Sequence, residues 1–181
     1  GQFCLPNVAH TSQTYEELLL AVQQKKIPTL QAKAGVSFQL GDDVSCSVLA
    51  PASDSYESLN DYSVVLHLSY GSTSFLFTGD AEALSEFEIL ASSSASPEAD
   101  VLKVGHHGSR TSTSEAFLDA IHPKYAVISC GIGNSYGHPH TEILEALAER
   151  GITVYRTDEL GDILACSDGS KISFAKAGAV P

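Results

Sequence analysis

The sequence contains no methionine and no tryptophan, and no apolar run approaches the ~20 residues needed to cross a bilayer. Its start also lacks the charged and then apolar pattern of a secretory signal. These absences predict a soluble segment without membrane contact of its own, and they leave the location of the parent protein open. Because the chain opens at Gly1 without an initiator methionine, we expect it to be a piece of a longer protein.

Basic residues are scarce. Ten Lys and Arg stand against 22 Asp and Glu, which gives a formal net charge of −12. A field of this sign repels polyanions, so the surface by itself does not concentrate nucleic acid. Any phosphate chemistry in this chain would therefore need a metal ion.

Several catalytic and structural motifs are missing as well. There is no Gly-x-Ser-x-Gly elbow, which argues against a serine hydrolase. The segment Gly131-Ile132-Gly133 has no third glycine in register and no GK[ST] occurs, so nucleotide-dependent mechanisms are not supported. The cysteines form no CxxC pair, which predicts buried, reduced thiols rather than a disulfide scaffold. They are Cys4, Cys46, Cys130 and Cys166.

What is present fits one globular domain over residues 1–181, with 43% apolar and 18% charged residues. A capping box at Thr14-x-x-Glu17 predicts a helix that ends before Pro28, and Ser112-x-x-Glu115 predicts a second cap. Apolar spacing predicts four helices in all. The positions expected to face the core are Tyr15, Leu18, Leu19 and Val22; Ala83, Leu84, Phe87 and Leu90; Ala116, Phe117, Ala120 and Ile121; and Ile143, Leu144, Leu147 and Ala148.

Runs rich in β-branched and aromatic residues predict the strands. They cover residues 36–40, 44–49, 62–68, 73–78, 101–104, 125–130, 152–155, 163–166 and 172–174. Turn residues at 41–43 and 70–72 join the first four strands into two hairpins. The polar segment 92–97 is too short to separate domains. Strands then alternate with helices, so we expect an α/β fold whose mixed sheet has helices packed on it.

Candidate metal ligands follow three of these strands: Asp80, then His106 and His107, then His138 with His140. Loops at strand ends converge in layered α/β folds. Carboxylate and imidazole suit zinc, manganese or iron, and the Asp80 carboxylate could bridge two ions roughly 3.5–4 Å apart. Taken singly, each has an ordinary alternative, because an aspartate in a turn and a histidine pair on a surface loop are common.

The segment 138–142 resembles a His-x-His-x-acid cluster, but Ile143 stands where a further histidine would complete it. The match is therefore partial. His10, His67 and His122 have no comparable context, and we interpret them as structural or exposed.

Three ordered segments carry a resemblance to a known family: 74–80 (SFLFTGD), 100–109 (DVLKVGHHGS) and 128–139. Together they resemble the metallo-β-lactamase-like domain of the bacterial DNA-uptake competence protein ComEC and its free-standing relatives. The similarity spans about Pro6 to Phe174. It implies a metallo-β-lactamase-like αββα sandwich with a metal site at one edge, where a metal-bound hydroxide hydrolyses ester, amide or phosphodiester bonds.

The resemblance also implies roles for individual residues. Asp80 matches the bridging metal ligand, and His106 and His138 match the imidazole ligands of a site for two zinc or manganese ions. His107 is either the ligand of its pair or a catalytic group that hydrogen-bonds the scissile substrate. By the same resemblance, Ser109 and Asn134 line the substrate pocket.

One departure from the family is serious. Its principal ligand motif, His-x-His-x-Asp-His, is expected a few tens of residues before Pro6-Asn7, and the chain has nothing there. We therefore expect the C-terminal portion of the domain: an incomplete sandwich, inactive or weakly active in isolation, with metal absent or incompletely held. Exposed sheet edges then favour homo-oligomers.

The substrate stays open at this point. DNA and a small-molecule ester or phosphodiester are both compatible with the resemblance, since pocket loops decide between them. The alternative from another class is a non-catalytic interaction or regulatory module that keeps the fold and uses its histidines for packing.

Overall fold

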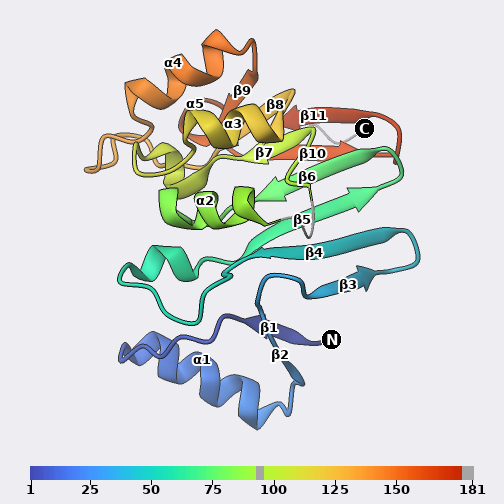
Figure 1. The fold of residues 1–181 in the computed structure, drawn as a ribbon, viewed down its shortest axis with the longest axis vertical. Coiled ribbons are helices and arrows are strands. Elements are labelled where there is room, and N and C mark those ends of the chain that lie inside the picture. Colours follow the sequence, from blue (N-terminus) through green and yellow to red (C-terminus); the bar gives the residue numbers. More distant parts are fainter. Residues whose placement is uncertain (93–95, 177–181) are drawn as a thin grey trace.

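The computed structural model describes residues 1–92 and 96–176, and Figure 1 shows their path. The strands are β1 (Phe3–Leu5), β2 (Thr29–Gln31), β3 (Ser37–Leu40), β4 (Val44–Ala50), β5 (Val65–Tyr70), β6 (Thr73–Phe77), β7 (Val101–Lys103), β8 (Tyr125–Ile128), β9 (Thr153–Arg156), β10 (Ile163–Ser167) and β11 (Ile172–Lys176). The helices are α1 (Gln13–Gln24), α2 (Ala83–Ala91), α3 (Glu115–Ile121), α4 (Thr141–Glu149) and α5 (Thr157–Leu160). Two short 3-10 helices are η1 (Leu59–Tyr62) and η2 (Gly105–Gly108).

A seven-stranded mixed sheet organises the fold, in the order β3-β4-β5-β6-β7-β8-β9. Strands β3 to β6 pair antiparallel: short turns join β3 to β4 and β5 to β6, and residues 51–64, which include η1, join β4 to β5. Strands β6 to β9 run parallel with helical crossovers. Since parallel strands need long connections, the helices between them pack back on the sheet. The predicted mixed sheet with flanking helices is confirmed.

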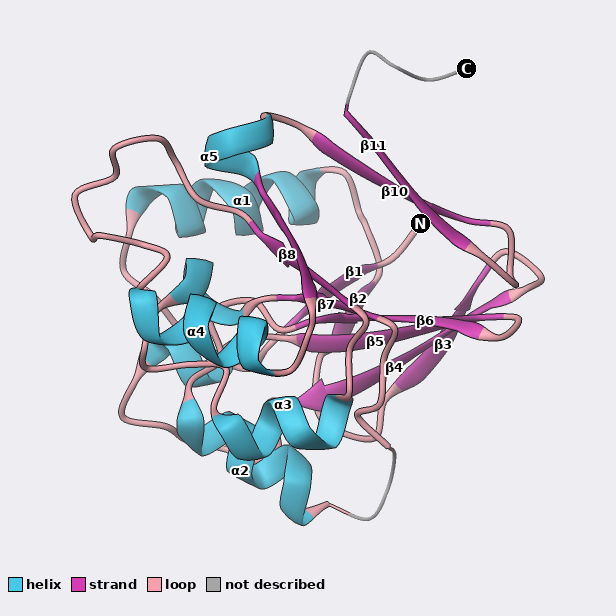
Figure 2. Ribbon diagram, turned by 90° about the horizontal axis from the view of Figure 1, so that it is seen from above, coloured by secondary structure: helices cyan, strands magenta, loops and turns pink. Residues whose placement is uncertain are grey.

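Helices α2, α3 and α4 cover one face of this sheet, as Figure 2 shows. The core between these layers is apolar and closely packed. Its fully buried side chains include Leu76, Leu102 and Ile128 from the strands and Phe117 and Leu147 from the helices. This core holds the carboxyl ends of β6, β7 and β8 in fixed positions, and the candidate site lies at those ends.

The antiparallel β10–β11 hairpin lies over the opposite face, above β6, β7 and β8. It is attached at the β5–β6 turn, where the Ser72 amide donates to the Gly169 carbonyl oxygen at 2.7 Å. Gly71 has a φ of +57°, and a Cβ there would lie 2.2 Å from the Gly169 carbonyl oxygen. Only glycine fits such an approach, so backbone contact fixes the hairpin to the sheet.

Two helix starts differ from the predicted ones. Helix α1 is capped by Ser12, whose hydroxyl accepts from the Tyr15 amide, and not by Thr14. Helix α3 is capped by Ser114, while the Ser112 hydroxyl donates to the Ala81 carbonyl at 2.7 Å. Both segments hold two candidate cap residues close together, and tertiary contacts decide which one caps the helix.

The core-facing side of α2 was predicted wrongly. Leu84, Phe87 and Leu90 are exposed, whereas Ser85, Glu86 and Ile89 are buried. The polar pair is tolerated because both side chains are hydrogen-bonded: Ser85 to Asp61, and Glu86 to the backbone before α3. Leu18 and Leu19 of α1 and Ala116 and Ala148 are likewise exposed.

The cysteine prediction holds in part. All four cysteines are free; Cys46 is buried, Cys4 and Cys130 are half-buried, and Cys166 is exposed. Of the predicted linker 92–97, residues 93–95 lie outside the described residues. In the described parts of the chain, no helix has both the length and the apolar character to span a membrane.

Candidate functional site

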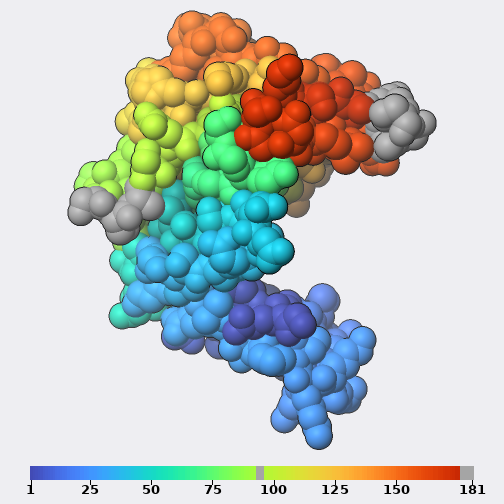
Figure 3. Space-filling model, turned by 90° about the vertical axis from the view of Figure 1, so that its right-hand side faces the viewer, coloured from blue at the N-terminus to red at the C-terminus, as the bar shows by residue number. Residues whose placement is uncertain are grey.

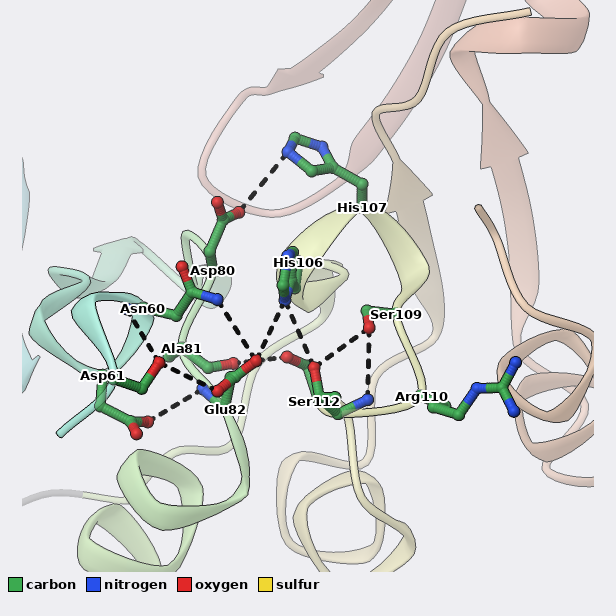
Figure 4. Close-up of polar contacts among 12 residues, drawn as sticks. Asn60, Asp61, Asp80, Ala81, Glu82, His106, His107, Ser109, Arg110 and Ser112 are labelled. Atoms are coloured by element: carbon green, nitrogen blue, oxygen red, sulfur yellow. Dashed lines mark hydrogen bonds and ion pairs between the residues drawn. The ribbon is translucent and has the colours of Figure 1, made fainter. Parts of the chain in front are cut away.

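Three loops meet at the carboxyl edge of the parallel strands. Asp80 follows β6, His106 and His107 follow β7, and His138 follows β8. These ends are adjacent because β6, β7 and β8 are neighbours in the sheet. The fold thus brings together the carboxylate and the imidazoles that the sequence singled out, and Figure 4 shows the first two loops in detail.

His107 faces Asp80. Its Nε2 lies 3.6 Å from the Asp80 Oδ1, and its Nδ1 lies 2.6 Å from the Ser129 carbonyl oxygen. A carbonyl oxygen can only accept, so Nδ1 carries the proton and donates. In the neutral ring, Nε2 therefore presents a lone pair toward Asp80.

His106 is held from the other side by Glu82, an acidic residue that was not among the predicted ligands. The His106 Nδ1 lies 3.4 Å from the Glu82 Oε1 and 3.3 Å from the Thr111 hydroxyl. Glu82 itself accepts from Ser58 and from Asn60, and Figure 4 shows the contact with Asn60. Burial acts to raise the pKa of Glu82, but the hydrogen bonds outweigh it and lower the pKa, so the carboxylate stays charged beside His106.

His138 completes the group of rings. Its centroid lies 5.7 Å from that of His106, 6.5 Å from that of His107 and 4.9 Å from that of His140. Burial lowers the pKa of His138, and the neighbouring imidazoles lower it further. The ring is thus neutral at neutral pH, the form in which imidazole binds metals.

His140 has a different part. Its Nδ1 accepts from the Arg110 amide at 3.0 Å, and its own amide donates to the Gly108 carbonyl at 2.9 Å. With Nδ1 already engaged, the ring connects the β8 loop to the β7 loop. The His-x-His-x-acid match of residues 138–142 was incomplete, and His140 here makes a contact between loops.

The histidine pair sits on strained backbone. His106 has φ and ψ of 43° and 46°, and His107 has 56° and 20°, both in the left-handed region. Such residues cost roughly 1–3 kcal/mol each and persist only where their surroundings fix them. The His106 amide donates to the Gly79 carbonyl at 3.0 Å, and Gly108 packs tightly against Pro139. The strained loop is therefore joined to both neighbouring loops.

A buried polar network supports this loop from below. The Glu86 carboxylate accepts from the amides of Thr113 and Ser114, and the Thr113 hydroxyl accepts from the Gly105 amide at 3.1 Å. Burial raises the pKa of Glu86. The buried face of α2 thus positions the residue that precedes the histidine pair.

A cavity of about 310 Å³ opens beside the rings, and His107, Cys130, Asn134, Tyr136 and His138 line it. The Asn134 side chain makes its hydrogen bonds within its own loop. Its amide group donates to the His138 carbonyl at 2.6 Å, and its oxygen accepts from the His138 amide at 3.0 Å. Burial, and then Asp158, raise the pKa of Cys130, so this thiol stays protonated and is a poor nucleophile.

Ser109 lies away from this cavity. It is buried and shares a hydrogen bond of 3.0 Å with the Thr111 hydroxyl, behind His106. The predicted pair of substrate residues is therefore separated: Asn134 lines the cavity and Ser109 braces the histidine loop. Their proposed contact with substrate stays a prediction.

The types of side chain at this edge suit a divalent metal, but too few of them converge to bind one. One carboxylate and several imidazoles suit zinc, manganese or iron. Within residues 1–92 and 96–176, however, no three His, Cys, Asp or Glu side chains form a group that could hold a metal ion. The described residues therefore do not make a complete coordination shell.

Two residues of the site that were not predicted from the sequence, Glu82 and Tyr136, lie next to predicted ones. Glu82 stands two positions after Asp80, and Tyr136 stands two before His138. The signal that could have found Glu82 is the Asp-x-Glu spacing just past a strand end, where an acid can face the next loop. Tyr136 was hidden in a glycine-rich loop whose conformation the sequence does not specify.

Comparisons with known proteins point in one direction. Residues 55–132 match the model of the metallo-beta-lactamase superfamily. The chain is 39% identical to ComE operon protein 3 of Bacillus subtilis over 82% of this chain and 19% of that protein. It is 36% identical to competence protein ComA of Neisseria gonorrhoeae over 66% of this chain and 17% of that protein. It is also 39% identical to recombination protein 2 of Haemophilus influenzae over 64% of this chain and 14% of that protein.

Solved structures resemble the fold at low identity. CmlA, a diiron beta-hydroxylase from Streptomyces venezuelae, aligns with a TM-score of 0.58 at 11% identity, over 86% of this chain and 38% of that one. A putative metal-dependent hydrolase from Parabacteroides distasonis aligns with a TM-score of 0.51 at 14% identity, over 87% of this chain and 64% of that one. Of the three competence and recombination proteins named above, the chain spans less than a fifth of the length.

Proposed function

We propose that this chain, a metallo-β-lactamase-superfamily domain similar to the competence proteins, supplies one side of a metal-dependent hydrolytic site. The proposed substrates of that site are phosphodiesters. One observation carries the proposal: Asp80 faces the His107 imidazole at one edge of the sheet, and the His138 ring lies beside that of His107. Carboxylate and neutral imidazole are the donors such a site uses.

The chain's own residues would hold and orient the metal. Asp80 offers carboxylate oxygens, His107 offers Nε2, and His138 offers a neutral ring. The Ser129 carbonyl and Glu82 fix the outer nitrogens of His107 and His106, as outer contacts of metal-binding histidines commonly do. When bound, the metal would activate a water molecule and polarise the phosphoryl group.

DNA is the proposed substrate. The competence and recombination proteins among the relatives, and the resemblance to a DNA-uptake family, support it. The net charge of −12 works against a polyanion, but a bound metal offsets that field locally. A small-molecule ester is the other substrate class that a test must include.

Metal titration of the purified chain tests the proposal. We expect zinc or manganese to bind weakly, and Asp80→Asn to lower that affinity by about 10-fold or more, because a charged ligand is lost. His122→Asn is the matched control: it removes an imidazole from the end of α3, at a left-handed position that asparagine tolerates. Equal affinities for Asp80→Asn and the control would refute the assigned ligand.

Hydrolysis of single-stranded DNA and of a lactone, with each metal added, completes the test. We expect little or no turnover by this chain alone, since the described residues lack a full ligand group. Robust turnover would contradict that part of the proposal. A protein that combines this domain with further metal ligands is expected to cleave DNA and to lose activity in Asp80→Asn.

The incomplete ligand group also favours a second candidate, a non-catalytic interaction or regulatory module. Such a module needs no stoichiometric metal. Elemental analysis of the purified protein separates the two candidates: one or two bound ions per chain support the hydrolase, and a metal-free protein supports the module.

A further inference from the structure

Tyr136 stands out at the rim of the cavity. Its side chain is 76% exposed and lines the cavity beside the candidate site. The ring stacks on His138, with centroids 5.6 Å apart and planes 21° apart. One face of the tyrosine thus contacts a predicted metal ligand, and most of the ring remains open to solvent.

The loop that carries Tyr136 is braced from within. The Asn134 amide group bridges the Gly131 and His138 carbonyl oxygens at 3.0 and 2.6 Å, and its oxygen accepts from the His138 amide. Gly133 and Gly137, with φ of +63° and +74°, allow the chain to turn between these contacts. The aromatic ring is therefore presented on a pre-organised loop, which lowers the entropy lost on binding.

We propose that Tyr136 is a stacking platform for an unpaired nucleobase, which would occupy the cavity beside His107 and His138. The inference rests on the proposed function and names its substrate as single-stranded nucleic acid. Stacking on an exposed aromatic ring is the usual way to hold bases without reading sequence. The cavity of about 310 Å³ has room for one base next to the rings.

Charge sharpens the inference. A net charge of −12 works against binding through the phosphate backbone, so we expect the affinity to come mainly from the bases. Backbone-driven binding weakens steeply as salt rises, because counterions are released. Base-driven binding to an acidic chain is expected to stay level or to tighten with salt, because salt screens the repulsion.

Fluorescence anisotropy with two labelled probes tests the platform in metal-free buffer containing a chelator. One probe is a thymidine oligomer of about eight nucleotides, and the other is an abasic oligomer with the same phosphates. We expect the full chain to prefer the thymidine oligomer, with affinity level or rising with salt. Tyr136→Ala should weaken binding of this oligomer by about 5- to 100-fold, and Tyr136→Phe should restore it.

Phe87→Ala is the matched control, since Phe87 is 68% exposed on α2 and does not line the cavity. It is expected to leave both probes unaffected. Equal binding of the two probes, no binding of either, or an equal loss in Tyr136→Ala and Phe87→Ala would overturn the inference. Because these measurements need no metal and no cleavage, they are independent of the metal titration. Base-dependent binding together with equal metal affinities for Asp80→Asn and His122→Asn would refute the proposed function alone.

Discussion

At the scale of single residues, the outer contact of each imidazole decides what the ring can do. Ser129 fixes the proton of His107 on Nδ1, Glu82 faces Nδ1 of His106, and the Arg110 amide engages Nδ1 of His140. Two rings are thereby aimed inward and the third serves as a loop contact. Tautomers set in this way need no metal to be in place.

Asp100 gives a residue-scale test of electrostatics. It accepts from the Lys124 amine at 2.8 Å and the Ser74 amide at 3.0 Å, and although burial acts to raise its pKa, these bonds lower it. A carboxyl with a lowered pKa stabilises the fold above its ordinary pKa, and this stability is lost as the pH falls through the folded-state pKa. Asp100→Asn is therefore expected to cost about 1 kcal/mol near pH 7 and much less near pH 3.

Urea unfolding at both pH values measures this effect. Asp54→Asn is the control, because Asp54 is 83% exposed in its pair with Lys33 and such pairs contribute little. An Asp100→Asn deficit of the same size at both pH values would show that charge is not its cause.

The sequence predicted which residues would approach one another at the site, but not how each would point. Strand ends placed Asp80, His106 and His138 at one edge, and the structure brings them together. The choice between His106 and His107 depends on two left-handed residues in succession, and no local pattern specifies that conformation. Ser109 lies away from the cavity because its hydroxyl bonds to Thr111, a contact that the sequence pattern does not indicate.

At the scale of elements, helices were predicted more reliably than their buried faces. Helices α1 to α4 all lie where apolar spacing placed them. The face of α2 was wrong because Glu86 is buried to hold the backbone before α3, a requirement set by another element. Apolar periodicity assumes that polar groups seek water, and a buried carboxylate with backbone partners breaks that assumption.

The start of α1 offers an element-scale test. Ser12→Ala is expected to destabilise α1 by about 1 kcal/mol, because the Tyr15 amide loses its partner. Thr14→Ala, inside the first turn and exposed, should be neutral or slightly stabilising, since alanine has the higher helix propensity. Amide hydrogen exchange in α1 measures both. Faster exchange in Thr14→Ala than in Ser12→Ala would contradict Ser12 as the cap and support the predicted cap at Thr14.

At the scale of the whole molecule, the two faces of the sheet are covered unequally. Helices bury one face, whereas a groove of about 300 Å³ remains between β10 and the strands β6 to β8 on the other. Phe77 in this groove is 43% exposed, and Leu40 on β3 is 50% exposed. The molecule is visibly hollowed between its C-terminal hairpin and its N-terminal segment (Figure 3).

Because the β10–β11 hairpin covers this face only in part and leaves Phe77 exposed, we expect the chain to self-associate. Sedimentation over a range of concentrations is expected to reveal dimers or larger species, and Phe77→Ser should weaken them by about 10-fold, since a large apolar side chain is removed. Phe87→Ser on the helical side serves as the comparison, with little change expected. A chain that stays monomeric at every concentration would contradict the prediction.

The close contact of Gly71 with Gly169 makes a surface turn intolerant of substitution. These positions lie in turns near the surface, where substitutions are ordinarily harmless. Here a main-chain carbonyl faces position 71 directly, so every larger residue at 71 collides with it, although Ser72 and Thr73 add side-chain hydrogen bonds nearby. In a saturation mutagenesis experiment, position 71 would rank with the interior leucines rather than with its turn neighbours.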